Sequence, residues 1–224
     1  MDNVASRPIV ANDECAADAA PRRRPDGWLV AEGIVTTRNP DGTTNVAPMG
    51  PLVDPAMTRF ILRPFRTATT YANLIRTGEA VFHVTDDVEL LARAAVGRLD
   101  TPPPLSAVDC VDVTVLDGAC RWYALKLRSA DDRDERSWIE TDVVERRFQR
   151  EFFGFNRAKH AVLEAAILAT RVGLLAAAEI LGEFERLAVI VEKTGGDRER
   201  RAFSLLDGFV RDWGTKESGA KVSG

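Results

Sequence analysis

Apolar and polar residues follow two different periods along the chain. In the first two thirds, short runs rich in β-branched and aromatic residues are bounded by turn signals, which is the pattern of strands. These runs cover residues 27–38, 44–53, 57–63, 79–85, 111–117, 121–129 and 137–146. About seven strands with few helices between them are expected to close into a small antiparallel barrel, because closure leaves no edge strands with unpaired backbone groups.

Helices are expected at two places within this strand-rich part. One covers about residues 69–77 and ends at Gly78, and the other covers 86–99 with an acidic start. The segment 100–106 that follows contains three consecutive prolines, which supply no backbone donors, so it is expected to be a loop.

A helical period governs the chain beyond residue 150. Between 155 and 181 apolar residues recur at helical spacing, as at Phe155, Ala158 and Val162. Further helices are expected over 183–193 and 198–213, separated by two glycines. The predicted fold class is therefore mainly β with α, a β-barrel followed by a C-terminal three-helix unit.

The spacing of apolar residues and the composition divide the chain into three parts. Residues 1–26 are alanine-rich, of mixed charge and without apolar periodicity, so they are expected to form a flexible leader. Residues 27–150 are expected to form the barrel domain and residues 151–224 the C-terminal helical unit.

Charge and hydropathy exclude several kinds of partner. A net charge of −4 and a pI near 5.4 argue against a nucleic-acid-binding face, which is normally basic. No apolar run reaches membrane-spanning length, and the N-terminal residues contain no apolar core of a signal peptide. We therefore expect a cytoplasmic protein that binds neither nucleic acid nor membrane.

The start of the helix at 69–77 carries an unusual set of side chains. Threonine hydroxyls and guanidinium groups both suit phosphate oxygens, and a helix N-terminus attracts anions. The set comprises Arg63, Arg66, Thr67, Thr69, Thr70 and, one turn on, Asn73. An anion site is one interpretation; the other is a single capping threonine beside solvated arginines and β-forming threonines.

Other chemistry has little support in the sequence. Neither a Rossmann fingerprint nor a P-loop is present, and neither histidine has ligand-spaced partners, so no metal site is expected. On the helix after residue 155, Asn156, Arg157 and His160 fall within about one and a half turns. They are candidate catalytic residues in the wall of a substrate pocket, or else they belong to a solvated or intersubunit face.

Three blocks of the sequence, "EGIVTTRNPDGTTNVAPMG", "LRPFRTATTYANLIRTGEAVFHVTDD" and "FGFNRAKHAVLEAAILATR", resemble the DUF447 family in the family's order. These are FMN-binding split-barrel proteins related in fold to flavin reductases and pyridoxamine-phosphate-oxidase-like proteins. The resemblance runs from about residue 27 to residue 213. It implies that residues 27–150 form the split-barrel, flavin-binding domain, in a homodimer with FMN at the subunit interface.

The resemblance also assigns roles to individual positions. It implies that the threonine turn holds the FMN phosphate with help from Arg63 or Arg66, and that Asn73 contacts the phosphate or ribityl oxygens. The strand segment running beside the isoalloxazine ring comprises Asn45, Val46, Ala47, Pro48 and Met49.

The implied function is an FMN-dependent oxidoreductase that passes hydride or electrons between a nicotinamide donor and a small organic acceptor. A pterin-like compound is one candidate acceptor, because family members often occur beside tetrahydromethanopterin-linked metabolism. A non-catalytic flavin carrier or sensor is the alternative, since no convincing acid or base stands out. A barrel that binds no cofactor and only mediates assembly is the third reading.

Overall fold

The computed structural model describes residues 22–222 of the chain. Most of the expected leader, residues 1–21, lies outside this range. Within it, Arg22 is tied to the barrel, because its Nε donates to Oδ2 of Asp131 at 3.1 Å. None of the helices in the described range is both long enough and apolar enough to cross a membrane.

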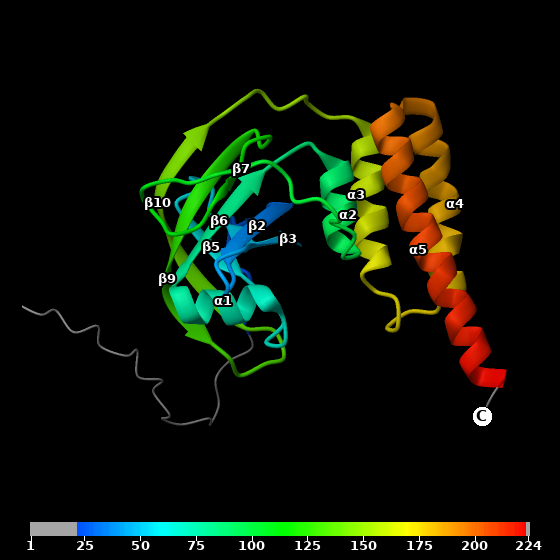
Figure 1. Ribbon diagram of the computed structural model, residues 1–224, viewed down its shortest axis with the longest axis horizontal. Coiled ribbons are helices and arrows are strands. Elements are labelled where there is room, and N and C mark those ends of the chain that lie inside the picture. The colour runs from blue at the N-terminus through cyan, green and yellow to red at the C-terminus, as the bar shows by residue number, and fades with distance from the viewer. Residues whose placement is uncertain (1–21, 223–224) are drawn as a thin grey trace, which may run out of the picture.

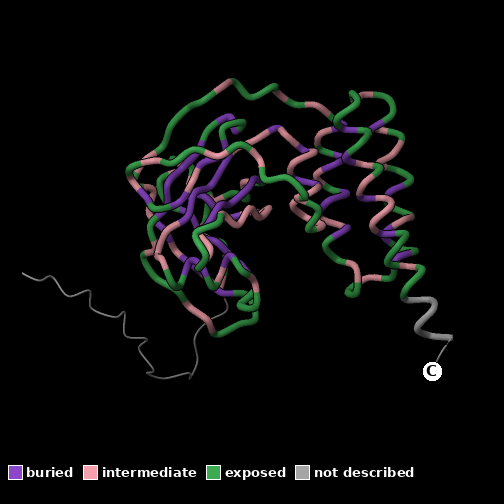
Figure 2. Tube along the Cα trace, viewed as in Figure 1, coloured by how far each residue is buried: buried purple, intermediate pink, exposed green. Residues whose placement is uncertain are grey.

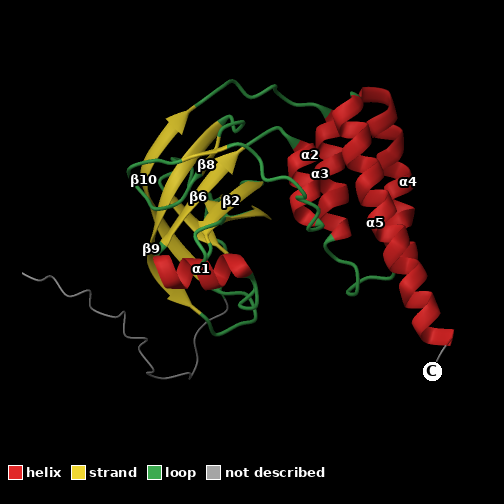
Figure 3. Ribbon diagram, viewed as in Figure 1, coloured by secondary structure: helices red, strands yellow, loops and turns green. Residues whose placement is uncertain are grey.

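Eight strands of the described chain form one antiparallel sheet that curls into a split barrel (Figure 1, Figure 3). Two further short strands pair only with each other. In spatial order the sheet contains β1 (Leu29–Val30), β4 (Leu52–Val53), β5 (Arg59–Leu62), β10 (Trp138–Phe148), β9 (Arg121–Asp131), β6 (Glu79–Val84), β2 (Gly33–Arg38) and β3 (Thr44–Met49), and the separate pair is β7 (Leu105–Ser106) with β8 (Val115–Leu116).

One long, kinked hairpin closes the barrel. Its two arms pair with each other as β2 with β3 and as β1 with β4. The same hairpin joins β6 through β2 and joins β5 through β4, so it brings the two sides of the sheet together. The sequence predicted each arm as one continuous strand; instead the first arm breaks at Ala31 and Glu32 and the second at Gly50 and Pro51. Breaks of this kind bend a strand at a barrel corner.

The inward-facing residues of the sheet form the barrel core. Phe60, Phe82 and Tyr123 pack as a cluster of tilted rings with centroids 5.3–6.5 Å apart. Helix α1 (Thr69–Thr77) lies across one end of the barrel and contributes the buried Leu74 to the same core (Figure 1).

The remaining helices form a layer beside the barrel. They are α2 (Val88–Ala95), α3 (Arg157–Ala169), α4 (Ala177–Thr194) and α5 (Asp197–Val222). Although α2 belongs to the barrel part of the sequence, it packs on α3 and α5. Figure 2 shows buried segments inside the barrel and where these helices face one another. The expected fold class, a split β-barrel followed by C-terminal helices, is confirmed.

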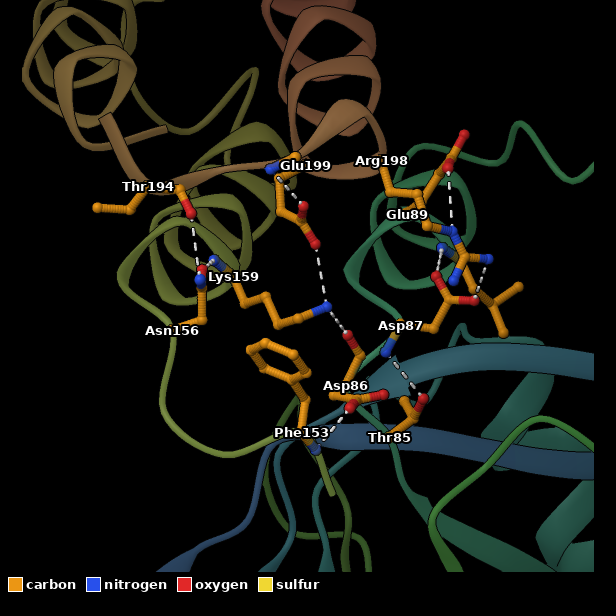
Figure 4. A network of polar contacts seen from close by, with 12 residues as sticks. Thr85, Asp86, Asp87, Glu89, Phe153, Asn156, Lys159, Thr194, Arg198 and Glu199 are labelled. Atoms are coloured by element: carbon orange, nitrogen blue, oxygen red, sulfur yellow. Dashed lines mark hydrogen bonds and ion pairs between the residues drawn. The ribbon is translucent and has the colours of Figure 1, made fainter. Parts of the chain in front are cut away.

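A network of polar contacts joins the two layers (Figure 4). Lys159 Nζ on α3 donates to the carbonyl oxygen of Asp86, which follows β6, and lies 3.0 Å from Oε1 of Glu199 on α5. The Asp86 carboxylate accepts from the backbone N–H of Phe153 in the connecting segment, at 2.9 Å. Burial opposes its ionisation, but hydrogen bonds from Arg150 and Phe153 give it a net lowered pKa. These contacts fix where the helices stand relative to the barrel.

Three details of the predicted elements were wrong. The expected helix over 155–181 breaks after Ala169, because Gly173 adopts a positive φ of 83°, and α4 then absorbs the helix expected over 183–193. Phe155, expected on the apolar helix face, precedes the helix and is 94% exposed.

The third detail concerns the strand expected over 111–117. Only Val115 and Leu116 form a strand there, and they pair with Leu105 and Ser106 of the expected loop. The apolar alternation of Val111, Val113 and Val115 instead reflects their burial against the outer side of β6 and β9.

Candidate functional site: a cleft between the barrel and the helices

A cleft of about 380 Å³ lies between the kinked hairpin, the start of α1 and the helices α2 and α3. It brings together residues that are far apart in the sequence, from the barrel and from the helical layer. The lining residues are Glu32, Ala47, Pro48, Met49, Gly50, Arg63, Pro64, Phe65, Ala68, Thr70, Leu91, Ala95, Arg136, Leu163, Ala166, Ile167 and Thr170.

Two facing walls of the cleft are largely apolar. One wall is the end of β3, Ala47–Met49, which the sequence assigned to the edge of a flavin ring. The other wall comes from α2 and α3, with Leu91, Leu163 and Ile167 among its residues. A slot with one apolar wall on each side suits a flat aromatic ligand.

One end of the cleft is cationic. The guanidinium of Arg63 donates through Nη2 to the carbonyl oxygen of Gly50 at 3.2 Å. Its Nε is buried and is the one buried side-chain polar atom in the described residues without a hydrogen-bond partner. Desolvation and the like charge of Arg136 lower the pKa of Arg63, against the opposing charge of Glu32, and an arginine so placed remains a cation. A buried guanidinium N–H without a protein partner can donate to an anion that enters the cleft.

The start of α1 opens beside this cation. Its N-cap is Ala68, which lines the cleft and provides no capping side chain, and its first turn has no acidic residue. Thr70 also lines the cleft, whereas Thr69 is exposed in the same first turn. The positive end of the helix and Arg63 therefore act on the same space.

Asn45 and Asn73 do not line the cleft but belong to a polar network that includes Thr37 and the cleft residue Thr70. Nδ2 of Asn73 donates to Oγ1 of Thr37 at 3.1 Å, and its residue is only 1% exposed. Nδ2 of Asn45 donates to Thr37 at 3.1 Å and to Thr70 Oγ1 at 3.0 Å. The two asparagines thus hold α1 against β2 and β3, and the placement of Thr70 depends on them.

Other predicted site residues lie elsewhere. Arg66 and Thr67 line a separate surface hollow with Tyr71, and Arg66 Nη1 donates to the carbonyl oxygen of Asp132 at 3.2 Å. Val46 packs against the core of the helical layer. Of the two arginines left open by the sequence, the structure brings only Arg63 to the cleft.

The three candidate catalytic residues of α3 do not line the cleft. Asn156 caps the helix by accepting from Lys159 N–H at 3.1 Å, and its Nδ2 donates to the carbonyl oxygen of Thr194. Arg157 and His160 are exposed, and the His160 ring meets the ring of Phe155 edge-on. Within residues 22–222, no cluster of His, Cys, Asp and Glu could hold a metal ion.

Sequence reasoning missed Glu32, which lines the cleft at the kink of the hairpin. The available signal was weak: a carboxylate directly before a glycine, in the middle of the β-rich run 27–38. It also missed Arg136, whose guanidinium lies 4.0 Å from the ring centroid of Phe65. Nothing in its charged turn, residues 130–136, distinguished Arg136 from its neighbours.

The geometry belongs to a split-barrel protein with a helical layer, and the chain is a member of the DUF447 family. Residues 31–150 match the model described as "Protein of unknown function (DUF447) N-terminal domain", and residues 156–208 match "Protein of unknown function (DUF447)". The family resemblance seen in the sequence is confirmed. No curated protein is similar enough to match the chain.

Solved structures agree with this fold. An FMN-bound DUF447 protein of Methanosarcina mazei superposes with a TM-score of 0.70 at 24% identity, over 80% of this chain and 94% of that one. FMN, the cofactor expected from the sequence, is thus named for a member of the same family. A flavin reductase domain protein from Arthrobacter sp. FB24 gives a TM-score of 0.47 at 19% identity, over 55% and 79% of the two chains. A Pseudomonas fluorescens 2-nitrobenzoate 2-nitroreductase gives 0.45 at 20% identity, over 52% and 64%.

Proposed function

We propose that the cleft binds FMN and that the protein is an FMN-dependent oxidoreductase acting between a nicotinamide donor and a small organic acceptor. The observation that carries this proposal is the buried, unpartnered Nε of Arg63 beside the uncapped start of α1. A phosphate placed there would accept from Arg63 and from the helix N–H groups, with Thr69 and Thr70 adding hydroxyl donors.

The rest of the cleft fits the remainder of the cofactor. The isoalloxazine ring would lie along Ala47–Met49, with α3 facing it from the other wall. The cleft volume falls within the usual range of about 300–1,000 Å³ for small-molecule sites. Since the phosphate would end the ligand at α1, the site offers no place for the adenine half of FAD.

These positions give separate roles to the cofactor and to the residues of the chain. Bound FMN supplies the capacity for hydride or single-electron transfer, because redox chemistry of this kind resides in the cofactor. The chain's residues bind and orient it: Arg63 and α1 fix the phosphate end, while β3 and α3 exclude water from the ring. Lys159 on α3 donates to the carbonyl oxygen of Asp86 at 2.8 Å and so ties α3 to the barrel.

Extraction of the cofactor from purified protein, followed by chromatography, tests the proposal. We expect a yellow protein with FMN as the main flavin. FAD as the main species, or no flavin after reconstitution, contradicts it. NAD(P)H oxidation by the loaded protein then separates an oxidoreductase from a flavin carrier or sensor, which would show no turnover.

We further propose a homodimer with the flavin close to the subunit interface. Leu29 and Val30 on the edge strand β1 are 67% and 42% exposed, and Phe65 in the cleft lining is 41% exposed. A second subunit would cover such apolar surface and shield the flavin. Light scattering on the chain from Gly27 onward should give the mass of a dimer, and a folded, flavin-loaded monomer would argue against this interface.

A further inference from the structure

We propose that Glu32 is the proton donor of the cleft and that the acceptors reduced there are small molecules with a polarised double bond, such as conjugated ketones. The inference rests on the proposed FMN-dependent reductase function and names its substrate class. It supplies the acid that the sequence did not reveal.

The position of Glu32 is set by the barrel corner. Glu32 stands at the break between β1 and β2, directly opposite the break at Gly50. The carboxyl group lies against the α-carbon of Gly50 so closely that a Cβ there would be 2.6 Å from Oε1 and 2.8 Å from Cδ. Any larger residue at 50 would displace the carboxyl group. The glycine therefore seats the Glu32 carboxyl group beside the β3 segment that forms one wall of the slot.

The carboxyl group is left without a protein partner. Among the described residues it makes no hydrogen bond and no ion pair, even though Arg63 lies near enough to affect its pKa and donates to the Gly50 carbonyl oxygen. The carboxylates of Asp86 and Glu199, in the network of polar contacts between the two layers, each accept hydrogen bonds. Glu32 is an exposed residue, unlike the buried Asp86 and Glu199, so its carboxyl group is open to solvent and to a ligand that enters the cleft.

The surroundings of Glu32 raise the pKa of its carboxyl group, although the residue itself is exposed. Desolvation raises its pKa most, the like charge of Glu164 on α3 adds to this, and Arg63 opposes both. The other charged group in the cleft lining is Arg136, in the turn between β9 and β10, which faces Arg63. A carboxyl group with a raised pKa keeps a larger protonated fraction near neutral pH and is a better general acid.

With FMN bound as proposed, the reduced flavin would supply a hydride that forms a C–H bond at one end of the acceptor's double bond, and the π electrons would move to the other end. That atom takes the proton of the Glu32 carboxyl group, which is left as a carboxylate and recovers a proton from water. The acceptor is reduced by two electrons, and the nicotinamide donor restores the flavin. An acceptor that takes electrons singly, such as ferricyanide, needs no proton from Glu32.

Glu32→Gln tests the inference in the full-length, FMN-loaded protein, with cyclohex-2-enone and ferricyanide as the two acceptors. We expect unchanged FMN content, unchanged ferricyanide reduction and a loss of about 100-fold in enone reduction. Equal enone rates in wild type and variant overturn the inference, and so does a wild-type protein that reduces ferricyanide but not the enone. A protein without FMN would instead refute the proposed function, which the flavin content reveals separately.

Glu164→Gln is the matched control, because it removes one carboxylate near the cleft that does not line it. Enone reduction should persist, but its decline with rising pH should move to lower pH, since loss of the like charge lowers the pKa of Glu32. The Glu32 carboxyl carbon, followed by NMR in labelled protein, should titrate above the ordinary glutamate range in wild type and lower in this variant. An ordinary pKa in wild type would contradict the inference without reference to activity.

Discussion

The guanidinium of Arg63 donates through Nη2 to the carbonyl oxygen of Gly50 at 3.2 Å, while its buried Nε has no partner among the described residues. This relationship makes Arg63, and not Arg66, the expected cation for the FMN phosphate. Arg63→Ala should weaken FMN binding about 10- to 100-fold, the equivalent of about 1.5–3 kcal/mol for a charged hydrogen bond, and should change riboflavin binding little.

Titration of flavin fluorescence measures both affinities. Arg66→Ala is the control, because Arg66 lines the separate hollow, and it should bind FMN like the wild type. A larger loss from Arg66→Ala than from Arg63→Ala would move the phosphate site away from the cleft.

Asn73 and Thr69 should separate stability from ligand binding. Asn73→Ala removes a buried donor to Thr37 and Asn39, with only Asn45 still donating to Thr37, so the free energy of unfolding should fall by about 1–3 kcal/mol. Thr69→Ala, at an exposed position of the same helix, should change that free energy by less than about 0.5 kcal/mol.

Thr69→Ala should nevertheless weaken FMN binding, whereas Asn73→Ala should reduce FMN and riboflavin binding alike. Denaturant titration and flavin binding on the two variants provide the comparison. If Asn73→Ala instead has normal stability and weakens binding of FMN but not of riboflavin, Asn73 contacts the ligand directly, as the family resemblance implies.

His83 should make stability depend on pH. The ring is fully buried, with Nδ1 3.1 Å from the carbonyl oxygen of Ile34, and Nε2 accepts from the N–H of Leu116 at 3.0 Å. Burial lowers its pKa from 6.5 to about 4, although the Ile34 carbonyl oxygen opposes this. His83 therefore becomes protonated below about pH 6.5 in the unfolded chain but only below about pH 4 in the native protein. Stability should fall as pH drops through this window, by roughly 3 kcal/mol in total.

Unfolding free energies at pH 7, 5.5 and 4.5 test this dependence. His83→Gln, which can still accept from Leu116 and donate to Ile34, should remove most of the slope above the range where carboxylates titrate. The same slope in both proteins would assign it to other groups.

Lys159 should hold the helical layer in place. Its side chain is 19% exposed and that of Glu199 is 11% exposed, so the pair is partly buried. Lys159→Met leaves the Glu199 carboxylate without its cation and should cost about 1–3 kcal/mol, less than a fully buried pair would. The double variant with Glu199→Gln should lose less than the sum of the single variants. Additive losses in thermal unfolding would mean that the contact contributes little.

Several parts of the fold were predictable because their signals are local. Strand alternation, the Pro-Asp-Gly turn and the αL glycine after α1 are set within a few residues, so the barrel and α1 could be expected from the sequence. The break at Gly173 was not, because the apolar spacing continues through it. The kinks at Glu32 and Gly50 depend on how the two hairpin arms fit the barrel corner, which no local pattern encodes.

The anion-binding and ring-facing residues of the candidate site could be predicted from the sequence, but the helix that faces them and Glu32 could not. Arg63, Thr70 and the 47–49 segment were expected and lie together, because a strand end, a helix start and a neighbouring strand meet at the barrel corner. The α3 wall and Glu32 come from tertiary packing between distant segments. The "FNRAKH" block, interpreted as the wall of a substrate pocket or as a solvated or intersubunit face, contains the helix cap Asn156 and Lys159, which contacts the barrel side.

A crystal structure of the full-length protein with FMN tests the central claim most directly. We predict the phosphate within hydrogen-bonding distance of Arg63 Nε and the first N–H groups of α1, and the isoalloxazine ring between Ala47–Met49 and α3. FMN bound in the hollow beside Arg66 and Thr67, or on any other surface, would contradict the account.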